Sequence, residues 1–420
     1  MRERLHSNAI RAAAFGTARA FDRSARALGW SPVSLDPHTL EAVARRTARL
    51  DDFGDPYYRE GLEHLVRSLE ADAGLHLIGR IYMRRIIRQA LVNRLLLQQD
   101  RRARPEIYDA PLRPPIIITG LPRTGSTLLH RMMSRIPGFF APPYWLLVRP
   151  LPARPGEPDE VRRTAALHEM RWWKRITPSV RTKHPLSVNS PEECMFALAL
   201  TFHTSLFGLV VPLEGYLDWY AKSDRRKKYA DYRAILLALQ ARRPNRTLLL
   251  KAPDHLDGLD ALYAAVPGAK VVQLHRDPVA VVNSLASLAY ASQSGLTERR
   301  DPARLAAGLA DHLEATLRRS QAIRPHLPLP VLDVHYDAFV ADPLGTAARI
   351  LEAFGLPARR GRNQMAEYLA RESPTERPRH HYSGAEFGFD DDRTAERFRF
   401  YSACFQTAPG KRVDVHLTLP

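Results

Sequence analysis

Cysteine is scarce in this sequence. Only Cys194 and Cys404 occur among its 420 residues. Two cysteines cannot build a disulfide framework or a zinc site made of several thiolates. This scarcity is typical of proteins from reducing compartments, and we therefore expect a cytoplasmic protein.

Long apolar segments are also missing. A membrane-spanning helix needs about 20 mostly apolar residues, and the most apolar stretch, residues 194–211, is interrupted by Thr201, His203 and Ser205. Residues 1–23 are charged and rich in alanine, so they lack the apolar core of a signal peptide. We expect residues 194–211 to form a buried helix and the protein to have no integral membrane span.

Positive charge, by contrast, is abundant. The chain has 62 Lys and Arg residues against 45 Asp and Glu, which gives a net charge of +17 and favours anionic partners. Aromatic and basic residues are interleaved between Tyr216 and Gln240, a pattern found in sites for single-stranded nucleic acid. The same pattern is typical of an amphipathic helix whose charged face meets water. Because the excess charge is spread along the chain, we prefer the second interpretation and expect no nucleic-acid partner.

Periodicity divides the chain into two parts. Residues 1–105 repeat apolar side chains at helical spacing and predict a helical N-terminal region. Residues 106–420 predict an α/β domain with a helical insertion at about 140–245, because short apolar strands alternate there with helices. That alternation is typical of a parallel β-sheet flanked by helices on both faces. We expect the strands at residues 116–119, 247–251, 270–276 and 329–334.

One loop combines a strand end, a glycine turn and a helix start, between residues 116 and 133. This order aims backbone N–H groups and the positive end of a helix at one place, which suits phosphate or sulfate. Gly125 permits close approach of an anion, Ser126 and Thr127 add hydroxyl donors, and the Arg123 guanidinium can hold two oxygens. We expect the binding residues of this loop to be Pro122, Arg123, Thr124, Gly125, Ser126, Thr127 and Leu128.

The loop differs from the Walker A motif of nucleotide-binding P-loops. That motif ends in Gly-Lys-Ser/Thr and places its hydroxyl on Mg²⁺, whereas Gly125 directly precedes Ser126 here and the loop has no lysine. We therefore expect no metal site. A P-loop-type small-molecule kinase is the first alternative function, and a non-catalytic, basic nucleic-acid-binding protein is the second.

A second candidate anion site begins at Arg276. This arginine ends an expected strand, Asp277 and Pro278 cap and open the following helix, and Ser284 lies eight residues after Arg276. An arginine at a strand end and a serine two turns into the next helix can reach one phosphate at the carboxyl edge of the sheet, where open α/β sheets bind ligands. The two motifs together predict a ligand with two separate anionic groups.

Both motifs resemble those of the sulfotransferases that use 3′-phosphoadenosine 5′-phosphosulfate (PAPS). The Pro-Arg-Thr-Gly-Ser-Thr loop is similar to the 5′-phosphosulfate loop of that family, and Arg276 with Ser284 matches its pair for the 3′-phosphate. Residues 250–256 and 381–388 resemble bacterial members, and Tyr382 lies in the segment that covers the cofactor in them. The resemblance spans roughly residues 115–405. It implies the P-loop-like sulfotransferase fold, PAPS as the donor, and transfer of a sulfuryl group to a hydroxyl or amine.

The acceptor is not determined by the resemblance. Its pocket is expected within residues 140–220, and a small molecule, a lipid or a glycan are all compatible with such a segment. A homodimer is equally left open.

The general base is not determined either. Cytosolic members use a histidine in a Lys-Thr-His-Leu-Pro segment, and the matching segment here, Lys251-Ala-Pro-Asp-His255, has its histidine two residues later. We rank His255 first, Glu192 or Glu193 second and His130 third; the alternative role of the two glutamates is to cap a buried helix. Arg123 replaces the lysine of many members, and we expect it to stabilise charge in catalysis while giving up a proton poorly.

Overall fold

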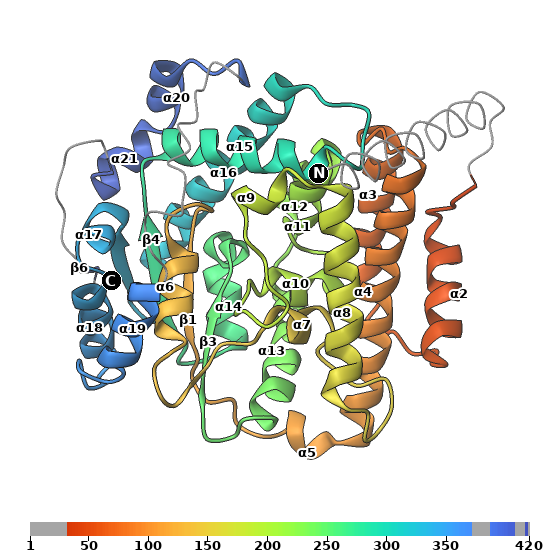
Figure 1. The fold of residues 1–420 in the computed structure, drawn as a ribbon, viewed down its shortest axis with the longest axis horizontal. Coiled ribbons are helices and arrows are strands. Elements are labelled where there is room, and N and C mark those ends of the chain that lie inside the picture. Colours follow the sequence, from red (N-terminus) through yellow and green to blue (C-terminus); the bar gives the residue numbers. More distant parts are fainter. Residues whose placement is uncertain (1–31, 372–386, 408–415, 419–420) are drawn as a thin grey trace, which may run out of the picture.

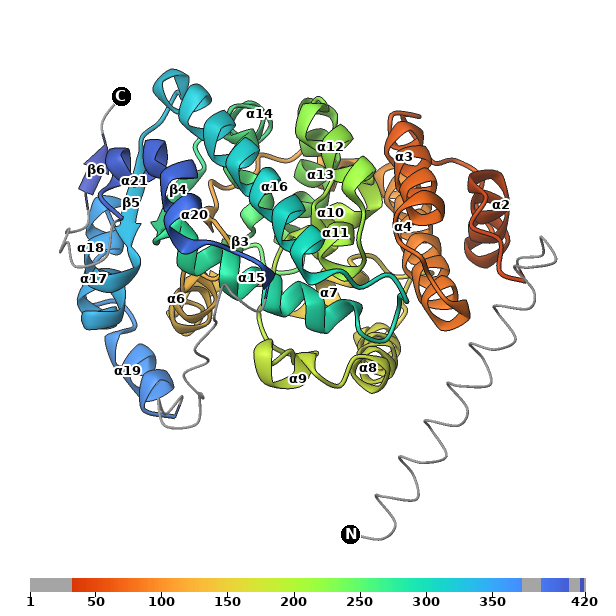
Figure 2. The ribbon, with the colours of Figure 1, turned by 90° about the horizontal axis from the view of Figure 1, so that it is seen from above.

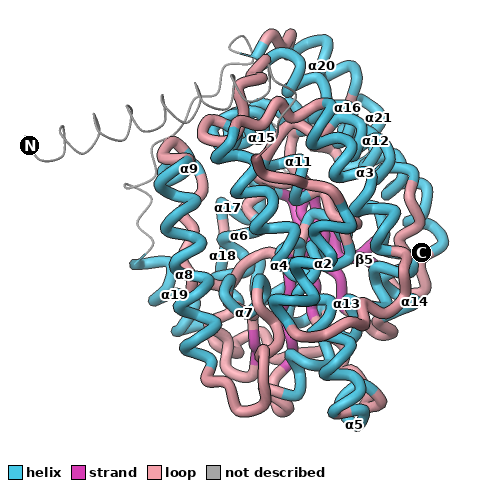
Figure 3. The backbone as a smooth tube through the Cα atoms, turned by 90° about the vertical axis from the view of Figure 1, so that its right-hand side faces the viewer, coloured by secondary structure: helices cyan, strands magenta, loops and turns pink. Residues whose placement is uncertain are grey.

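A computed structural model describes residues 32–371, 387–407 and 416–418. One β-sheet stands between two groups of helices (Figure 1), and helices enclose the strands when the molecule is turned (Figure 3). Tyr382 lies outside the described residues.

The sheet has six strands in the order β2-β3-β1-β4-β5-β6. The first five are parallel, and β6 pairs with β5 in the antiparallel direction at the edge. The strands are β1 (Ile116–Gly120), β2 (Phe139–Phe140), β3 (Thr247–Lys251), β4 (Lys270–His275), β5 (Val331–His335) and β6 (His416–Thr418). The parallel sheet of the prediction is therefore confirmed, with β2 and β6 as additions too short to stand out in the sequence.

Alternate side chains of each strand enter different apolar cores. Ile116 and Ile118 of β1 pack with helices on one face, whereas Ile117 packs on the other. Leu249 and its neighbour Leu250 divide in the same way. Because both faces are buried, the strands read as continuous apolar runs in the sequence.

In the C-terminal half of the chain, the helices α17 (Tyr336–Ala341), α18 (Pro343–Ala353) and α19 (Arg362–Arg371) cover the first face of the sheet together with α6 (Ser126–Met133). The other helices of this half are α14 (Leu259–Ala265), α15 (Pro278–Gln293), α16 (Pro302–Ile323), α20 (Asp391–Arg397) and α21 (Arg399–Phe405), with 3₁₀ turns η2 (Pro253–Gly258) and η3 (Arg324–His326).

The N-terminal region is helical, as predicted, over its described part. Asp36 caps the first described helix by accepting a hydrogen bond from the Thr39 N–H at 2.7 Å. The helices are α2 (Pro37–Ala48), α3 (Tyr58–Ala71), α4 (Leu77–Ala103) and α5 (Pro105–Tyr108). Apolar residues from α2, α3 and α4 share one continuous core with the insertion and with the second face of the sheet. These helices are therefore an integral wall of the molecule (Figure 2).

The insertion after β2 is helical, but it differs from the prediction in one segment. Residues 194–211 were expected to form one buried helix, whereas the chain breaks at Phe202, whose φ of 56° is left-handed. The helices of the insertion are α7 (Tyr144–Val148), α8 (Asp159–Ile176), α9 (Val180–Lys183), α10 (Met195–Leu198), η1 (Ala199–Thr201), α11 (Leu206–Val210), α12 (Glu214–Lys222) and α13 (Arg226–Ala241). Within the described part of the chain, no helix is both long enough and apolar enough to cross a membrane.

Candidate active site

The anion-binding loop follows β1 at the carboxyl edge of the sheet. Gly125 precedes α6 with a φ of 82°, and its carbonyl accepts hydrogen bonds from the N–H groups of Leu128 and Leu129. The N–H groups of Ser126 and Thr127 lie in the first turn of α6, where a helix offers them no carbonyl, so they are available to an anion. The Thr124 hydroxyl instead donates to the Leu121 carbonyl at 2.8 Å and fixes the loop from within.

Arg123, Ser284 and Arg276 are brought together, although Arg123 and Arg276 are 153 residues apart in the chain. The Arg123 Nε donates to the Ser284 hydroxyl at 2.9 Å, and Nη1 of Arg276 donates to the Arg123 carbonyl at 2.7 Å. The Arg276 guanidinium also lies over the Tyr336 ring, 4.1 Å from its centroid. The two motifs therefore form one positively charged edge, with the Arg123 guanidinium in the loop after β1 and the Arg276 guanidinium after β4.

Lys251 joins this edge from the end of β3. Its Nζ donates to the Thr127 hydroxyl at 3.1 Å and to the Glu193 carboxylate at 2.5 Å. The lysine is buried, and about a fifth of the Glu193 side chain is exposed. Sequence reasoning did not include Lys251 among the site residues. The sequence feature that could have identified it is a single charged residue at the end of an apolar strand, because ligands bind at the carboxyl ends of parallel strands.

The two glutamates have separate partners, and neither caps a helix. Glu192 is buried and accepts from Nη2 of Arg131 at 2.8 Å, while His184 lies 4.0 Å from its other oxygen. Glu193 pairs with Lys251, and the nearest helix begins only at Met195. The capping alternative is therefore wrong. Both carboxylates line the cavity described below.

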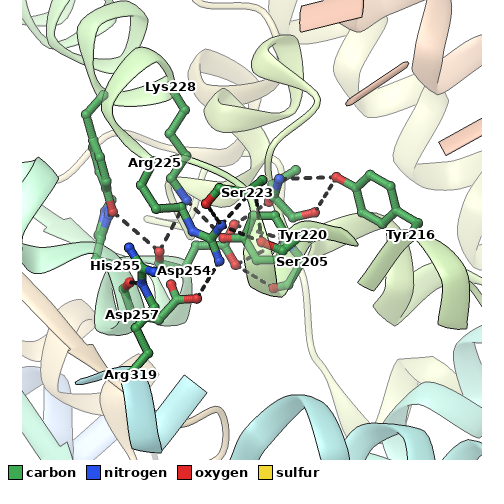
Figure 4. Close-up of polar contacts among 12 residues, drawn as sticks. Ser205, Tyr216, Tyr220, Ser223, Arg225, Lys228, Asp254, His255, Asp257 and Arg319 are labelled. Atoms are coloured by element: carbon green, nitrogen blue, oxygen red, sulfur yellow. Dashed lines mark hydrogen bonds and ion pairs between the residues drawn. The ribbon is translucent and has the colours of Figure 1, made fainter. Parts of the chain in front are cut away.

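His255 is placed away from this edge. After Lys251 the chain turns into the 3₁₀ segment η2, which carries the imidazole into the core beside the rings of Tyr229 and Tyr232. Its Nδ1 shares a hydrogen bond with the Tyr229 hydroxyl at 3.1 Å, and burial lowers its pKa to about 3. Figure 4 shows it within a buried polar network that includes Arg225 and Lys228.

His255 is not among the described residues that line the cavity, and neither is His130. His130 contacts the Leu249 carbonyl at 3.1 Å, and burial lowers its pKa to about 3 as well. The expectation that His255 is the base is therefore not supported by its position. The histidine stands two residues later in the segment after Lys251 than in the family motif. At that position in η2 its side chain turns into the core.

A cavity of about 390 Å³ opens beside the loop. One end is formed by the loop together with Arg276 and Tyr336. The remaining walls come from the insertion, from α15 and from α4, and they are mostly apolar and aromatic. The face of α4 in the cavity was not predicted, because amphipathic spacing identifies an apolar face without identifying what that face covers.

No metal site is visible in the charged groups around the cavity. Among residues 32–371, 387–407 and 416–418, no three or more His, Cys, Asp or Glu side chains are grouped so that they could hold a metal ion. The positive groups of the edge, Arg123, Arg276 and Lys251, face one uncapped helix start. Positive side chains around a helix start suit an anion.

The fold and this edge define an α/β protein with a P-loop-like anion site at the carboxyl end of a parallel sheet. A sequence model of the sulfotransferase family matches residues 114–360, and the chain belongs to that family. A comparison with curated proteins finds no match.

Two solved structures are similar over most of the chain. Sulfotransferase STF1 from Mycobacterium tuberculosis H37Rv is 31% identical with a TM-score of 0.73, over 87% of this chain and 98% of that one. Sulfotransferase STF9 from Mycobacterium avium is 23% identical with a TM-score of 0.80, over 91% of this chain and all of that one. The second likeness concerns the fold alone. The sulfotransferase fold predicted from the two motifs is thus confirmed.

Proposed function

We propose that this protein transfers the sulfuryl group of PAPS to a hydroxyl group of an apolar acceptor. The observation that carries the proposal is the contact of the two anion motifs through Arg123, Ser284 and Arg276. PAPS has a 5′-phosphosulfate and a 3′-phosphate, so a protein that binds it needs two such motifs side by side. A P-loop kinase would need a lysine in the loop, which is absent.

The loop would hold the 5′-phosphosulfate and Arg276 with Ser284 the 3′-phosphate. Arg123 and the N–H groups of Ser126 and Thr127 stabilise the negative charge that develops on the transferred group and on the leaving phosphate oxygen. Lys251 adds a third positive charge through its contact with Thr127. The acceptor occupies the aromatic part of the cavity.

Glu193 is the base that the geometry favours. It lines the cavity and is partly exposed, whereas Glu192 is buried and engaged by Arg131. A carboxylate oxygen of Glu193 takes the proton of the acceptor hydroxyl while the oxygen of that hydroxyl forms a bond to sulfur. The bond between sulfur and the bridging phosphate oxygen breaks, and 3′-phosphoadenosine 5′-phosphate (PAP) leaves. Lys251 holds the carboxylate beside the loop.

Calorimetric titration tests the proposal directly. We expect PAP to bind with a dissociation constant in the micromolar range or below and without Mg²⁺, and we expect Mg²⁺-ATP to bind more weakly. Labelled sulfate should then pass from PAPS into hydroxyl-bearing acceptors. Stronger binding of Mg²⁺-ATP than of PAP would favour the kinase alternative. Binding of neither, with salt-dependent binding of single-stranded nucleic acid, would favour the nucleic-acid alternative.

A further inference from the structure

The end of the cavity remote from the loop is lined by residues of α4, α7 and α8. Here Tyr82, Tyr144 and Glu169 form a group that we call the distal cluster. Aromatic rings surround it: Tyr82 packs on Trp172 with centroids 5.3 Å apart, and Tyr144 meets Phe196 edge-on at 4.9 Å. A polar cluster inside an aromatic wall is costly unless its atoms have partners.

Glu169 uses only one of its carboxylate oxygens in protein contacts. Its Oε1 accepts hydrogen bonds from Nε of Arg85 at 3.3 Å and from Nη2 of Arg149 at 2.5 Å. Within the described part of the chain, Oε2 makes no hydrogen bond. One carboxylate oxygen of a residue that lines the cavity is therefore left without a hydrogen-bond donor.

The two tyrosine hydroxyls also have no hydrogen-bond partner among the described residues. Tyrosine hydroxyls within an aromatic wall usually find one. Burial raises the pKa of Tyr82 well above its usual range, and the nearby Tyr144 and Glu169 add to this. Burial, then Glu169 and Glu192, raise the pKa of Tyr144. Both hydroxyls thus stay protonated and can donate as well as accept.

The distal cluster and the proposed base lie along one path. Tyr144 is anchored beside the glutamates, because its N–H donates to the Ser190 carbonyl at 3.0 Å. Glu169 lines the same cavity from α8, and α8 stands apart from α6 in both views (Figures 1 and 2). A ligand whose reactive hydroxyl meets Glu193 would therefore extend its body toward the distal cluster.

Charge and hydrogen-bonding capacity together select the group that fits the distal cluster. Arg85, Arg88 and Arg149 surround the single Glu169 carboxylate, so the local charge is positive and disfavours an ammonium group. An anionic group can accept hydrogen bonds from the two tyrosines but has no proton to donate to Oε2 of Glu169, so it would leave that oxygen unpaired. A hydroxyl can donate to that oxygen and accept from either tyrosine, so it satisfies the cluster without adding charge.

We propose that the sulfuryl acceptor is an apolar molecule with a second hydroxyl group, which Tyr82, Tyr144 and Glu169 bind at the end of the cavity remote from the loop. This inference rests on the proposed function, since the other hydroxyl is the one that is sulfated. The distal cluster then determines acceptor specificity. It sets which alcohols bind and leaves the donor site unaffected.

The test compares four ten-carbon probes: 1,10-decanediol, 1-decanol, 10-hydroxydecanoate and 10-amino-1-decanol. Their binding to the full-length protein is measured by calorimetry, without nucleotide and with saturating PAP. A hydrogen bond to a charged partner gives roughly tenfold or more in affinity, so we expect the diol to bind at least about tenfold more tightly than each other probe. Sulfate transfer from PAPS should follow the same order.

Variants assign the preference to the distal cluster. In the Tyr82→Phe/Tyr144→Phe double variant and in Glu169→Gln, the ratio of diol to mono-alcohol affinity should fall toward one. Tyr263→Phe is the matched control, because Tyr263 is buried in α14 and its hydroxyl also has no partner there. In Tyr263→Phe the ratio should stay at the wild-type value.

Several outcomes would overturn the inference. A mono-alcohol that binds as well as the diol, or no binding of either, would remove the second hydroxyl from the acceptor. Tightest binding of 10-hydroxydecanoate would assign the distal cluster to an anion held by Arg85. A diol preference that depends on the distal cluster, without any sulfate transfer or PAP binding, would contradict the proposed function and retain the cluster as a hydroxyl-binding site.

Discussion

The donor end of the cavity and its acceptor wall are built in different ways. The donor end consists of strand ends and helix starts, with Arg123 and Arg276 each a few residues from a sheet strand. The acceptor wall consists of faces of α4 and α8, which lie far apart in the sequence and meet in the folded chain through contacts such as that of Tyr82 with Trp172. Short-range spacing therefore encodes the first region, whereas tertiary packing creates the second.

The largest expected effect concerns the base, which lies between the two regions. Replacing Glu193 with Gln removes the group that takes the acceptor proton, and a lost general base lowers turnover about 10²- to 10⁴-fold. PAP affinity should be retained, because the loop and Arg276 are unchanged. Steady-state turnover with PAPS and calorimetry with PAP measure the two quantities.

His255→Ala is the companion variant. Since His255 lies in the core and outside the cavity, we expect it to lower the melting temperature and to leave turnover near the wild-type value. An inactive but folded His255→Ala protein together with an active Glu193→Gln protein would restore the histidine as the base.

The next largest effect is expected from a variant that impairs the donor end alone. Arg123→Ala should lower turnover about 10²- to 10³-fold, as expected when a group that stabilises developing charge is removed. The fold should persist, because the side chain lies at the cavity surface and Gly125 still forms the turn. Turnover and the far-ultraviolet circular dichroism spectrum are the measurements. Arg123→Lys keeps a point charge and should retain part of the activity. Near-normal turnover of Arg123→Ala would show that the sulfuryl donor does not lie on this loop.

The same comparison explains which residues of the candidate site could be predicted from the sequence. The positions of Arg123, Arg276 and Ser284 followed from local order: strand, turn, helix. The pair of Lys251 and Glu193 did not, because those residues are 58 positions apart and meet only when the chain after β2 returns to β3. His255 was misplaced because spacing from Lys251 does not reveal that η2 turns the side chain inward.

Most of the fold could be predicted from the sequence. Five of its six strands are parallel and buried on both faces, so their apolar runs marked most of them without ambiguity. The break at Phe202 could not be predicted from composition, because a left-handed residue within an apolar stretch has no sequence signature when it is not glycine.

A moderate effect would separate the two anion positions within the donor end. Arg276→Ala should weaken PAP binding by about 1.5–3 kcal/mol, the cost of a lost charge-assisted hydrogen bond. Adenosine 5′-phosphosulfate lacks the 3′-phosphate, so its affinity should change less. Calorimetry with both ligands makes the comparison. Equal losses for the two would show that Arg276 does not bind the 3′-phosphate.

The smallest effect concerns stability and tests whether His255 is a core residue. An unfolded histidine titrates near pH 6.5, whereas burial lowers the pKa of folded His255 to about 3. Between those two values the unfolded chain binds a proton that the folded chain does not. The free energy of unfolding therefore falls as the pH falls, by about 1.4 kcal/mol per pH unit for one histidine.

The variant His255→Gln removes this proton while keeping a polar side chain beside Tyr229. Between pH 7 and pH 5, the wild-type protein should lose about 2 kcal/mol more stability than His255→Gln does. Urea unfolding at a series of pH values gives the two slopes. Leu256→Ala is the control: it truncates a neighbouring buried side chain, so it should lower stability equally at every pH and keep the wild-type slope. Identical slopes for wild type and His255→Gln would mean that His255 is already accessible to protons in the folded protein, and it would again be a candidate for chemistry.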